Sequence, residues 1–442
     1  MIQSFLETLQ NIFKVPELRK KIGFTFLLLI VYRLGFKIPL PGVDPERLGE
    51  LAEKMGGSGL GALFKLADLV SGGGFLSFTL FSLGIMPYIS AAIIFQLLTK
   101  VIPKLEEISK EGATGRQKIE QYTKYATILI CLIQGTMVVQ HLAGQTRLGL
   151  VPNPTIGFHI LAVLSLTTGA MFLIWLGKLI DDHGIGNGIS IIIMAGIIAR
   201  LPQSLGEVIE KVRVGELHYT AVVILLAAFV LTVVGVVFIQ QGQRRIPVQQ
   251  AKQTRGRRVY GGQRHFMPLR VNMAGVIPII FASSLLIFPR MITPMLGRNN
   301  PLDQMFQLGG YFHVLFYVAL TFFFCFFWNS LIFNPAEMAN NMKEYGSFIP
   351  GIRPGKKTAN YLERIITRIT LAGAAFLAFI AVFPEVLFSL AQLGFVFFLG
   401  GTSLLIVVGV ALDVVQKVES HLLMRHYKGF MGSGSGIRGR RT

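Results

Sequence analysis

The chain has 442 residues, of which 52% are apolar and 15% are charged, and its mean hydropathy is +0.58. Soluble domains carry roughly 25% charged residues, and a single aqueous core stops growing near ~250–300 residues. Because lipid must cover much of this apolar surface, the composition excludes soluble-enzyme, disordered and collagen-like classes. The net charge of +19 is compatible with nucleic acid, with anionic lipid, or with the basic cytoplasmic loops of a membrane protein.

Ten apolar segments are candidates for membrane spans, since a helix needs about 20 apolar residues to cross a bilayer. The shortest segment, 186–201, is the weakest candidate, although its flanks behave like helix ends. The ten segments are 22–40, 75–98, 122–143, 157–177, 186–201, 219–240, 271–289, 311–333, 366–384 and 387–412.

The basic residues alternate between the loops that follow successive spans. Thirty-one Lys and Arg residues fall on one side of the predicted membrane and nine fall on the other. Basic residues concentrate in cytoplasmic loops, so this asymmetry predicts an even number of spans with both termini in the cytoplasm. No signal-peptide cleavage site stands out after the first apolar run, which is therefore expected to remain as an anchor.

Three segments depart from a simple alternation of span and loop. Residues 60–70 have a helical apolar period, but at 1.5 Å per residue they reach only ~17 Å, about half a bilayer. They are either an amphipathic surface helix or a half-helix in a cavity between spans. Loop 241–270 has eight basic residues and no acidic one, and loop 334–368 contains the rigid turn PGIRPG. Both loops are either ordinary connections or partner-binding sites.

The sequence offers little catalytic or ion-coupling chemistry. It contains no HExxH motif, no P-loop and no Cys/His cluster, and both cysteines, Cys131 and Cys325, lie within apolar runs. The spans hold almost no acidic residue, whereas ion-coupled transporters keep such groups near the midplane. We therefore expect neither an enzyme nor a bound metal or cofactor. The spans do contain Gly and Pro at mid-depth with isoleucines beside them, which indicates either ordinary packing or an apolar constriction.

Seven motifs, in order along the chain, carry a resemblance to a known family. They are LGIMPYIS (83–90), GIGNGISIII (184–193), GQRRIPVQQAK with GRRVYGGQ (242–263), VNMAGVIPIIFASS (271–284), FNPAEMANN (333–341), PGIRPG (350–355) and GGTSLLIVVGV (400–410). The chain resembles the bacterial SecY family, the central subunits of the Sec protein-conducting channel. The resemblance covers nearly the whole sequence.

The resemblance implies an all-α polytopic membrane protein, with ten transmembrane helices in two inverted five-helix halves around a central pore. The halves are expected at 1–201 and 202–442. The first half would include a plug at about 60–73, and the second would include the cytoplasmic loops 241–270 and 334–368 and the basic tail 413–442. The expected plug residues are Leu60, Leu63, Phe64, Leu66, Ala67, Leu69 and Val70.

The resemblance also assigns roles to side chains in the spans. An apolar pore ring would seal the channel against ions, and a lateral gate would open between spans two and three and spans seven and eight. The expected ring residues are Ile85, Ile89, Ile193, Ile280, Leu286 and Ile406, with Leu286 the weakest member. The expected gate residues are Ser90, Gln134, Asn272 and Phe288.

The partners implied are the SecA ATPase, the ribosome through its RNA, SecE-like and SecG-like small membrane subunits, polypeptides with signal sequences, and membrane lipid. The implied location is the bacterial cytoplasmic (inner) membrane. Residues expected to dock SecA or the ribosome are Arg244, Arg245, Lys252, Arg255, Arg257, Arg258, Arg353, Lys356 and Lys357. The main alternative function is a ten-span secondary transporter of a small solute, which shares inverted repeats and broken helices. The third function considered is an intramembrane hydrolase.

Overall fold

The computed structural model describes residues 15–43, 78–144, 155–215, 218–251, 253–255, 258–260, 262, 264–273, 275–292, 310–390 and 401–432. These residues belong to two compact units, Met1–Gln203 with Val410–Thr442 and Ser204–Gly409. The expected plug, 60–73, lies outside the described residues.

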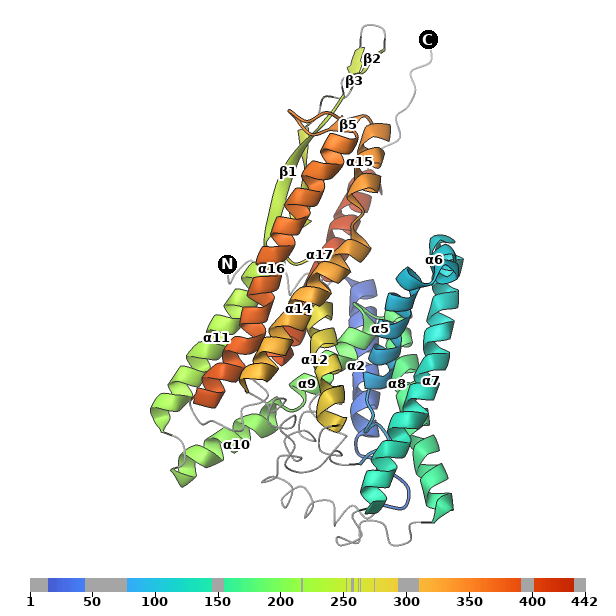
Figure 1. The fold of residues 1–442 in the computed structure, drawn as a ribbon, viewed down its shortest axis with the longest axis vertical. Helices are drawn as coiled ribbons and strands as arrows, with labels where there is room; N and C mark the ends of the chain where they lie inside the picture. Colours follow the sequence, from blue (N-terminus) through green and yellow to red (C-terminus); the bar gives the residue numbers. More distant parts are fainter. Residues whose placement is uncertain are drawn as a thin grey trace. The chain divides into compact units, whose positions relative to one another are not determined.

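The first unit consists of helices packed in neighbouring pairs. Helix α7 contacts α5 on one side and α8 on the other, and α8 also contacts α2 and α9 (Figure 1). Its helices are α2 (Pro16–Gly35), α5 (Met86–Val101), α6 (Pro103–Lys110), α7 (Ala113–Gly144), α8 (Ile156–His183) and α9 (Gly188–Ile198).

Within the described part of the second predicted span, 75–98, residues 78–85 are not helical and α5 begins at Met86, so the predicted start is wrong. The preceding segment takes two left-handed conformations, at Phe78 (φ 41°) and Gly84 (φ 55°), which a continuous helix excludes. Leu40 N donates to Phe78 O (2.9 Å) and Leu80 N donates to Ile38 O (3.0 Å). These bonds fasten segment 78–85 to the chain that follows α2. The first predicted span, 22–40, is corrected in the same way, because α2 ends at Gly35.

Helices α5 and α6 meet at a bend of 100°. Ile102 lies between them with φ −100° and ψ 113°, and it precedes Pro103. A residue before proline is sterically pushed out of the helical region, so the bend follows directly from the sequence Ile-Pro.

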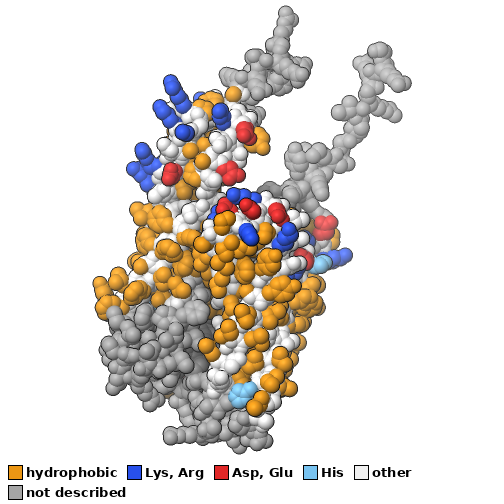
Figure 2. All heavy atoms as spheres, turned by 45° about the vertical axis from the view of Figure 1, so that its right-hand side comes forward, with side chains coloured by type: hydrophobic (Ala, Val, Ile, Leu, Met, Phe, Trp, Pro, Cys, Tyr) orange, Lys and Arg blue, Asp and Glu red, His pale blue; other side chains and the backbone are white. Residues whose placement is uncertain are grey.

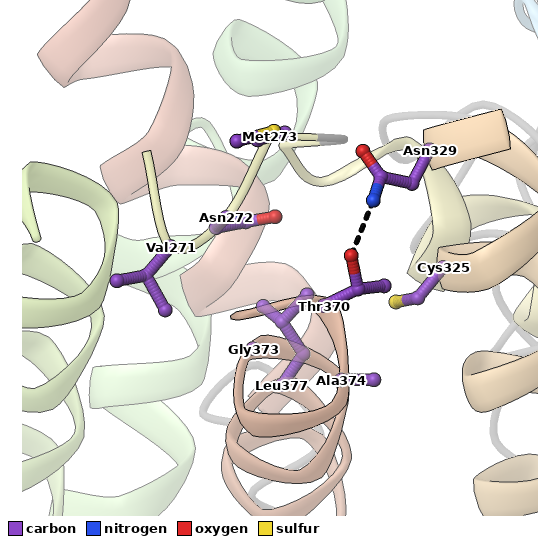
Figure 3. Close-up of a pocket in the computed structure, with 9 residues that line it drawn as sticks. All are labelled: Val271, Asn272, Met273, Cys325, Asn329, Thr370, Gly373, Ala374 and Leu377. Atoms are coloured by element: carbon purple, nitrogen blue, oxygen red, sulfur yellow. Dashed lines mark hydrogen bonds between the residues drawn. The ribbon is translucent and has the colours of Figure 1, made fainter. Parts of the chain in front are cut away.

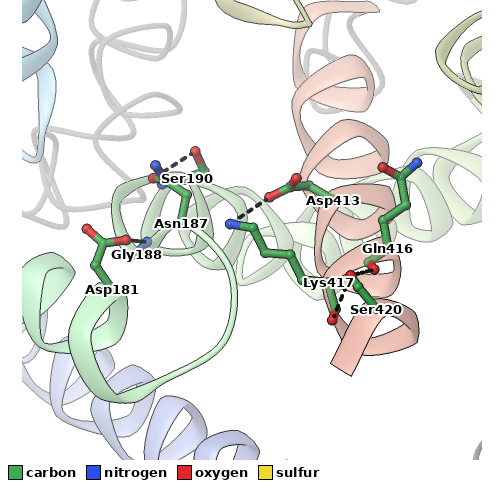
Figure 4. A network of polar contacts seen from close by, with 8 residues as sticks. All are labelled: Asp181, Asn187, Gly188, Ser190, Asp413, Gln416, Lys417 and Ser420. Atoms are coloured by element: carbon green, nitrogen blue, oxygen red, sulfur yellow. Dashed lines mark hydrogen bonds and ion pairs between the residues drawn. The ribbon is translucent and has the colours of Figure 1, made fainter. Parts of the chain in front are cut away.

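A set of polar contacts shapes the turn between α8 and α9 (Figure 4). Asp181 Oδ1 accepts a hydrogen bond from Gly188 N (2.7 Å), and Asn187 Oδ1 caps α9 by accepting from Ser190 N (3.1 Å). Gly186 has φ +93°, which favours glycine at that position. The motif GIGNG therefore builds a capped interhelical turn, as its glycines predict.

The second unit combines helices with a small sheet. Helix α14 packs on α12 and α16, and α11 packs on α16. Its helices are α10 (Leu201–Val214), which begins at the end of the first unit, α11 (Tyr219–Gln241), α12 (Ile277–Ile292), α14 (Tyr311–Ile332), α15 (Pro335–Glu344) and α16 (Lys356–Leu390). Helix α17 (Gly401–Gly432) begins in the second unit and continues in the first. The strands are β1 (Gln243–Gln250), β2 (Gln253–Arg255), β3 (Arg258–Tyr260), β4 (Arg264–Arg270) and β5 (Ser347–Phe348).

Within the described residues, six helices are long and apolar enough to cross a membrane, or seven if the bent pair α5–α6 is one span. Helices α9 and α12 are apolar but shorter, so the total of ten spans stays a prediction. In Figure 2 hydrophobic side chains cover most of the helical surface, and the Lys and Arg side chains gather above this surface in the view. Phe238, Val223 and Leu226 on α11 are each more than 60% exposed, as expected of a lipid-facing helix.

Candidate functional site

Loops 241–270 and 334–368, which the sequence analysis treats as separate, form one three-stranded sheet. Its strand order is β4-β1-β5, and both neighbouring pairs are antiparallel. Ile246 lies opposite Met267, and Gln249 of β1 lies between Arg264 of β4 and Phe348 of β5. The two loops therefore present a single surface (Figure 1).

One face of this sheet packs against helices α15 and α16. Side chains alternate between the two faces of a strand, so Ile246, Val248 and Leu269 share the inner face, and each is less than 5% exposed. The core beneath the sheet also includes Ile349, Leu362, Ile365, Ile366 and Ile369. This packing makes the sheet a rigid platform.

The opposite face of the sheet is basic and exposed. Arg245, Arg264 and Arg270 lie on it with the side chain of Phe266, which is 61% exposed. Neighbouring Pro247 and Phe266 are cross-strand partners. Three exposed arginines and an exposed aromatic side chain on one face of a sheet suit an anionic partner surface.

The turn PGIRPG continues the platform from β5 into α16. Gly351 and Gly355 have φ +85° and +102°, so both positions favour glycine. Thr358 Oγ1 donates to Arg353 O (2.9 Å), which fixes the backbone that carries this arginine. The side chains of Arg353, Lys356 and Lys357 are all exposed. These cations crowd the N-terminal end of a helix, where the dipole disfavours positive charge, so an anionic partner would stabilise them.

Five further residues are expected to dock partners. Arg244 is exposed on β1. Arg255 and Arg258 are cross-strand partners where β2 meets β3, so the backbone brings their positions together. Lys252 and Arg257 lie outside the described residues.

The expected ring residues are divided between the two units. In the first unit, Ile85 is the N-cap of α5, Ile89 lies one turn later, and Ile193 is on α9. In the second unit, Ile280 is half-buried on α12, whereas Leu286 and Ile406 are buried. The start of the predicted span 271–289 is wrong, because Gly275 has φ +65° and α12 begins only at Ile277, next to Pro278.

The four helices of the expected gate pack as two pairs, α5 with α7 in the first unit and α12 with α14 in the second. Ser90 and Gln134 are half-buried on α5 and α7. Asn272 is 8% exposed, and its Nδ2 donates to Gly275 O (3.0 Å), which stabilises the turn before α12. Phe288 belongs to α12, but its side chain lies outside the described residues.

Among the described residues, no three His, Cys, Asp or Glu side chains lie together as metal ligands would. The fold and the platform thus define a multi-pass helical membrane protein with a rigid basic surface on its second unit.

Comparison with known proteins identifies the family. A family model described as SecY matches residues 79–415. "Protein translocase subunit SecY" of Thermotoga maritima is 42% identical over 437 residues, which cover 98% of this chain and 100% of that protein. The protein of the same description from Escherichia coli strain K12 is 46% identical over 420 residues, which cover 93% of each. The chain therefore belongs to the SecY family, a family of protein-translocation channel subunits and not of enzymes.

Solved structures agree with the fold. One described as "The structure of a protein conducting channel" is similar with a TM-score of 0.63 and 20% identity, covering 92% of this chain and 93% of that one. Another, "Sec61 in the Canine ribosome-channel complex from the endoplasmic reticulum", has a TM-score of 0.60 at 18% identity, with coverage of 92% and 93%. These likenesses confirm the expected all-α polytopic fold.

Proposed function

We propose that this chain is the channel subunit that passes unfolded secretory polypeptides across the cytoplasmic membrane and releases hydrophobic segments sideways into lipid. The observation that carries this proposal is the identity of 42–46% to translocase subunits over at least 93% of the chain. A small-solute transporter finds no support, because the family model is SecY and the relatives and structures reported above are described as protein translocase subunits and protein-conducting channels. The energy would come from a partner, since the sequence has no nucleotide-binding motif.

The proposed path for the polypeptide is closed by an apolar ring of Ile85, Ile89, Ile193, Ile280, Leu286 and Ile406. A dry constriction of branched apolar side chains excludes ions by dewetting and forms no strong bond to a passing chain. The proposed plug at 60–73 would block the resting channel. The proposed gate, between α5–α7 and α12–α14, would let an apolar signal helix partition into lipid.

The basic platform is the proposed docking surface for the SecA ATPase or the ribosome. Its outer face and the PGIRPG turn carry exposed arginines and lysines on a rigid base, which suits binding to RNA phosphates with release of counterions. A solved relative at low identity is described as part of a ribosome-channel complex, which supports the ribosome as one partner.

The charge distribution and the exposed apolar helices support a proposed membrane location and proposed small membrane subunits. The asymmetry of 31 and nine basic residues supports a multi-pass protein of the bacterial inner membrane with both termini in the cytoplasm. SecE-like and SecG-like membrane subunits would pack against the exposed apolar helices, where lipid would cover the rest.

Reconstitution tests the proposed function. The chain is purified with its SecE-like subunit and inserted into vesicles, and SecA, ATP and a polypeptide with a signal sequence are added. We expect ATP-dependent protection of the polypeptide from external protease, and its loss when the signal is deleted. Vesicles that protect no polypeptide, but exchange a small solute, would overturn the proposal in favour of the transporter.

A further inference from the structure

A small cavity with a mainly apolar lining and a few polar groups lies in the second unit, where the proposed docking platform leads into α12. Its lining residues come from the segment after β4 and from helices α14 and α16: Val271, Asn272, Met273, Cys325, Asn329, Thr370, Gly373, Ala374 and Leu377 (Figure 3). The centre of a water molecule can occupy about 10 Å³ of it, which is about the space that one water needs.

Asn329 brings an unsatisfied acceptor to this cavity. Asn329 is 6% exposed, and no group in the described part of the chain donates a hydrogen bond to its Oδ1. Asn329 Nδ2 donates to Thr370 Oγ1, and the Thr370 hydroxyl donates to Ile366 O (2.8 Å). The Thr370 hydroxyl therefore accepts from the Asn329 amide and donates to Ile366 O at the same time, and in Figure 3 the Asn329 side-chain oxygen points away from it.

Asn272 provides a second polar group on the opposite wall. Its Nδ2 is occupied by Gly275 O, and in Figure 3 its side-chain oxygen points toward the space that Asn329 also faces. The wall behind it is close-packed, since a Cβ on Gly373 would come within 2.6 Å of Val271 O. The two amide oxygens therefore face a space of one water's size.

We propose that this cavity binds one water molecule, which donates hydrogen bonds to Asn329 Oδ1 and Asn272 Oδ1. Buried waters bridge otherwise unsatisfied polar groups in this way, and an unpaired carbonyl is disfavoured beside a membrane. Through this water Asn329 is a positioning residue that holds segment Val271–Met273, the connection from β4 to α12. Any consequence for gate opening rests on the proposed function, whereas the water site itself does not.

The test uses the complete complex in four forms. Asn329→Leu removes the acceptor and fills the cavity. Thr370→Val removes the partner of the Asn329 amide nitrogen but leaves its oxygen in place. Ser330→Ala is the matched control, because Ser330 is the exposed neighbour that donates only to Phe327 O among the described contacts. Each form is studied by a density map that resolves ordered water and by hydrogen exchange of segment 271–273.

We expect wild-type, Thr370→Val and Ser330→Ala maps to show one water peak about 3 Å from both oxygens. Asn329→Leu should lose the peak, and its segment 271–273 should exchange about tenfold faster. If Asn329→Leu does not assemble, Asn329→Ala takes its place and should also lose the peak. A wild-type map without the peak, or exchange in the Asn329 variant equal to that in Ser330→Ala, would overturn the proposal. If the wild-type complex translocates no polypeptide, the proposed function fails, but the map and the exchange still decide the water site.

Discussion

Gln249 of β1 and Phe348 of β5 are cross-strand partners, although 98 residues of sequence separate them. This pairing joins the basic hairpin 243–270 to the segment that contains Arg353. Ala251 N also donates to Gly346 O (2.8 Å), which extends the connection by one more hydrogen bond. The residues proposed for docking on β1 and in the PGIRPG turn thus belong to one platform, whereas Arg255 and Arg258 lie on the separate two-stranded sheet β2-β3.

Arg353→Glu is expected to abolish SecA-driven export. The side chain is exposed, so its reversal should change the free energy of unfolding by no more than about 0.5 kcal/mol. Its effect would come from repulsion of the anionic partner. Export of a secretory polypeptide and the abundance of the membrane-inserted protein are both measured, with Lys343→Glu, an exposed charge reversal on α15, as the control. Normal export by the Arg353 variant would exclude the docking role.

Ile246→Ala should loosen the platform from the helices below it. Ile246 is 2% exposed in the core shared with Leu362 and Ile366, and such truncations cost about 2–4 kcal/mol. Hydrogen exchange of β1 and β4 is the measurement, and faster exchange in both strands is the expected result. Phe266→Ala, on the exposed face, should leave exchange unchanged. Equal exchange in the two variants would mean that the inner face is not the anchor.

Gly169→Ala should destabilise the first unit. A Cβ at this position would lie 2.1 Å from Leu80 O, so α8 and segment 78–85 would have to separate. Overpacking costs about 1–3 kcal/mol, of which better helix propensity returns up to about 1 kcal/mol. Gly157→Ala, on the same helix with no atom within 4 Å of the added Cβ, is the control. Thermal unfolding should show a lower Tm only for the Gly169 variant; the same Tm for both would contradict the close approach.

Gln134→Leu tests whether the polar side chain of Gln134, one of the expected gate residues, opposes opening of the proposed lateral gate. Removing the polar group should ease gate opening, so substrates with weak signal sequences should be exported more efficiently. The comparison is between a weak-signal and a strong-signal substrate, and only the first should change. Leu132→Ala, on the same helix and 36% exposed, serves as the control. Unchanged export of the weak-signal substrate would show that the Gln134 side chain does not oppose gate opening.

The sequence predicts the long apolar helices well, because a continuous apolar run in lipid must satisfy its own backbone hydrogen bonds and therefore forms a helix. Segments 219–240 and 311–333 correspond closely to α11 (Tyr219–Gln241) and α14 (Tyr311–Ile332). Gly275 and Pro278 flank the start of α12 at Ile277, which lies later than the start of the predicted span 271–289.

The polar segments were predicted less well. Loop 241–270 forms strands, and the alternation of Ile246 and Val248 with polar neighbours was the signal for β1. Helix α10 occupies a segment that the sequence analysis treats as a loop, and α16 begins ten residues before the predicted span 366–384. Strand pairing between distant loops has no local signature, so the platform itself could not be read from the sequence.

The most direct test of the central claim is disulfide trapping of a translocating polypeptide at Ile280. Cys131 and Cys325 are replaced, one cysteine is placed at Ile280, and another is placed in the middle of a stalled secretory polypeptide. Leu285→Cys is the control, because Leu285 is 46% exposed and lies about 140° around α12 from Ile280. We predict a crosslink at Ile280, dependent on ATP and a functional signal, and none at Leu285. Crosslinks that form only with cysteines on the platform would mean that the polypeptide docks without passing through the protein. This result would contradict the proposed channel function.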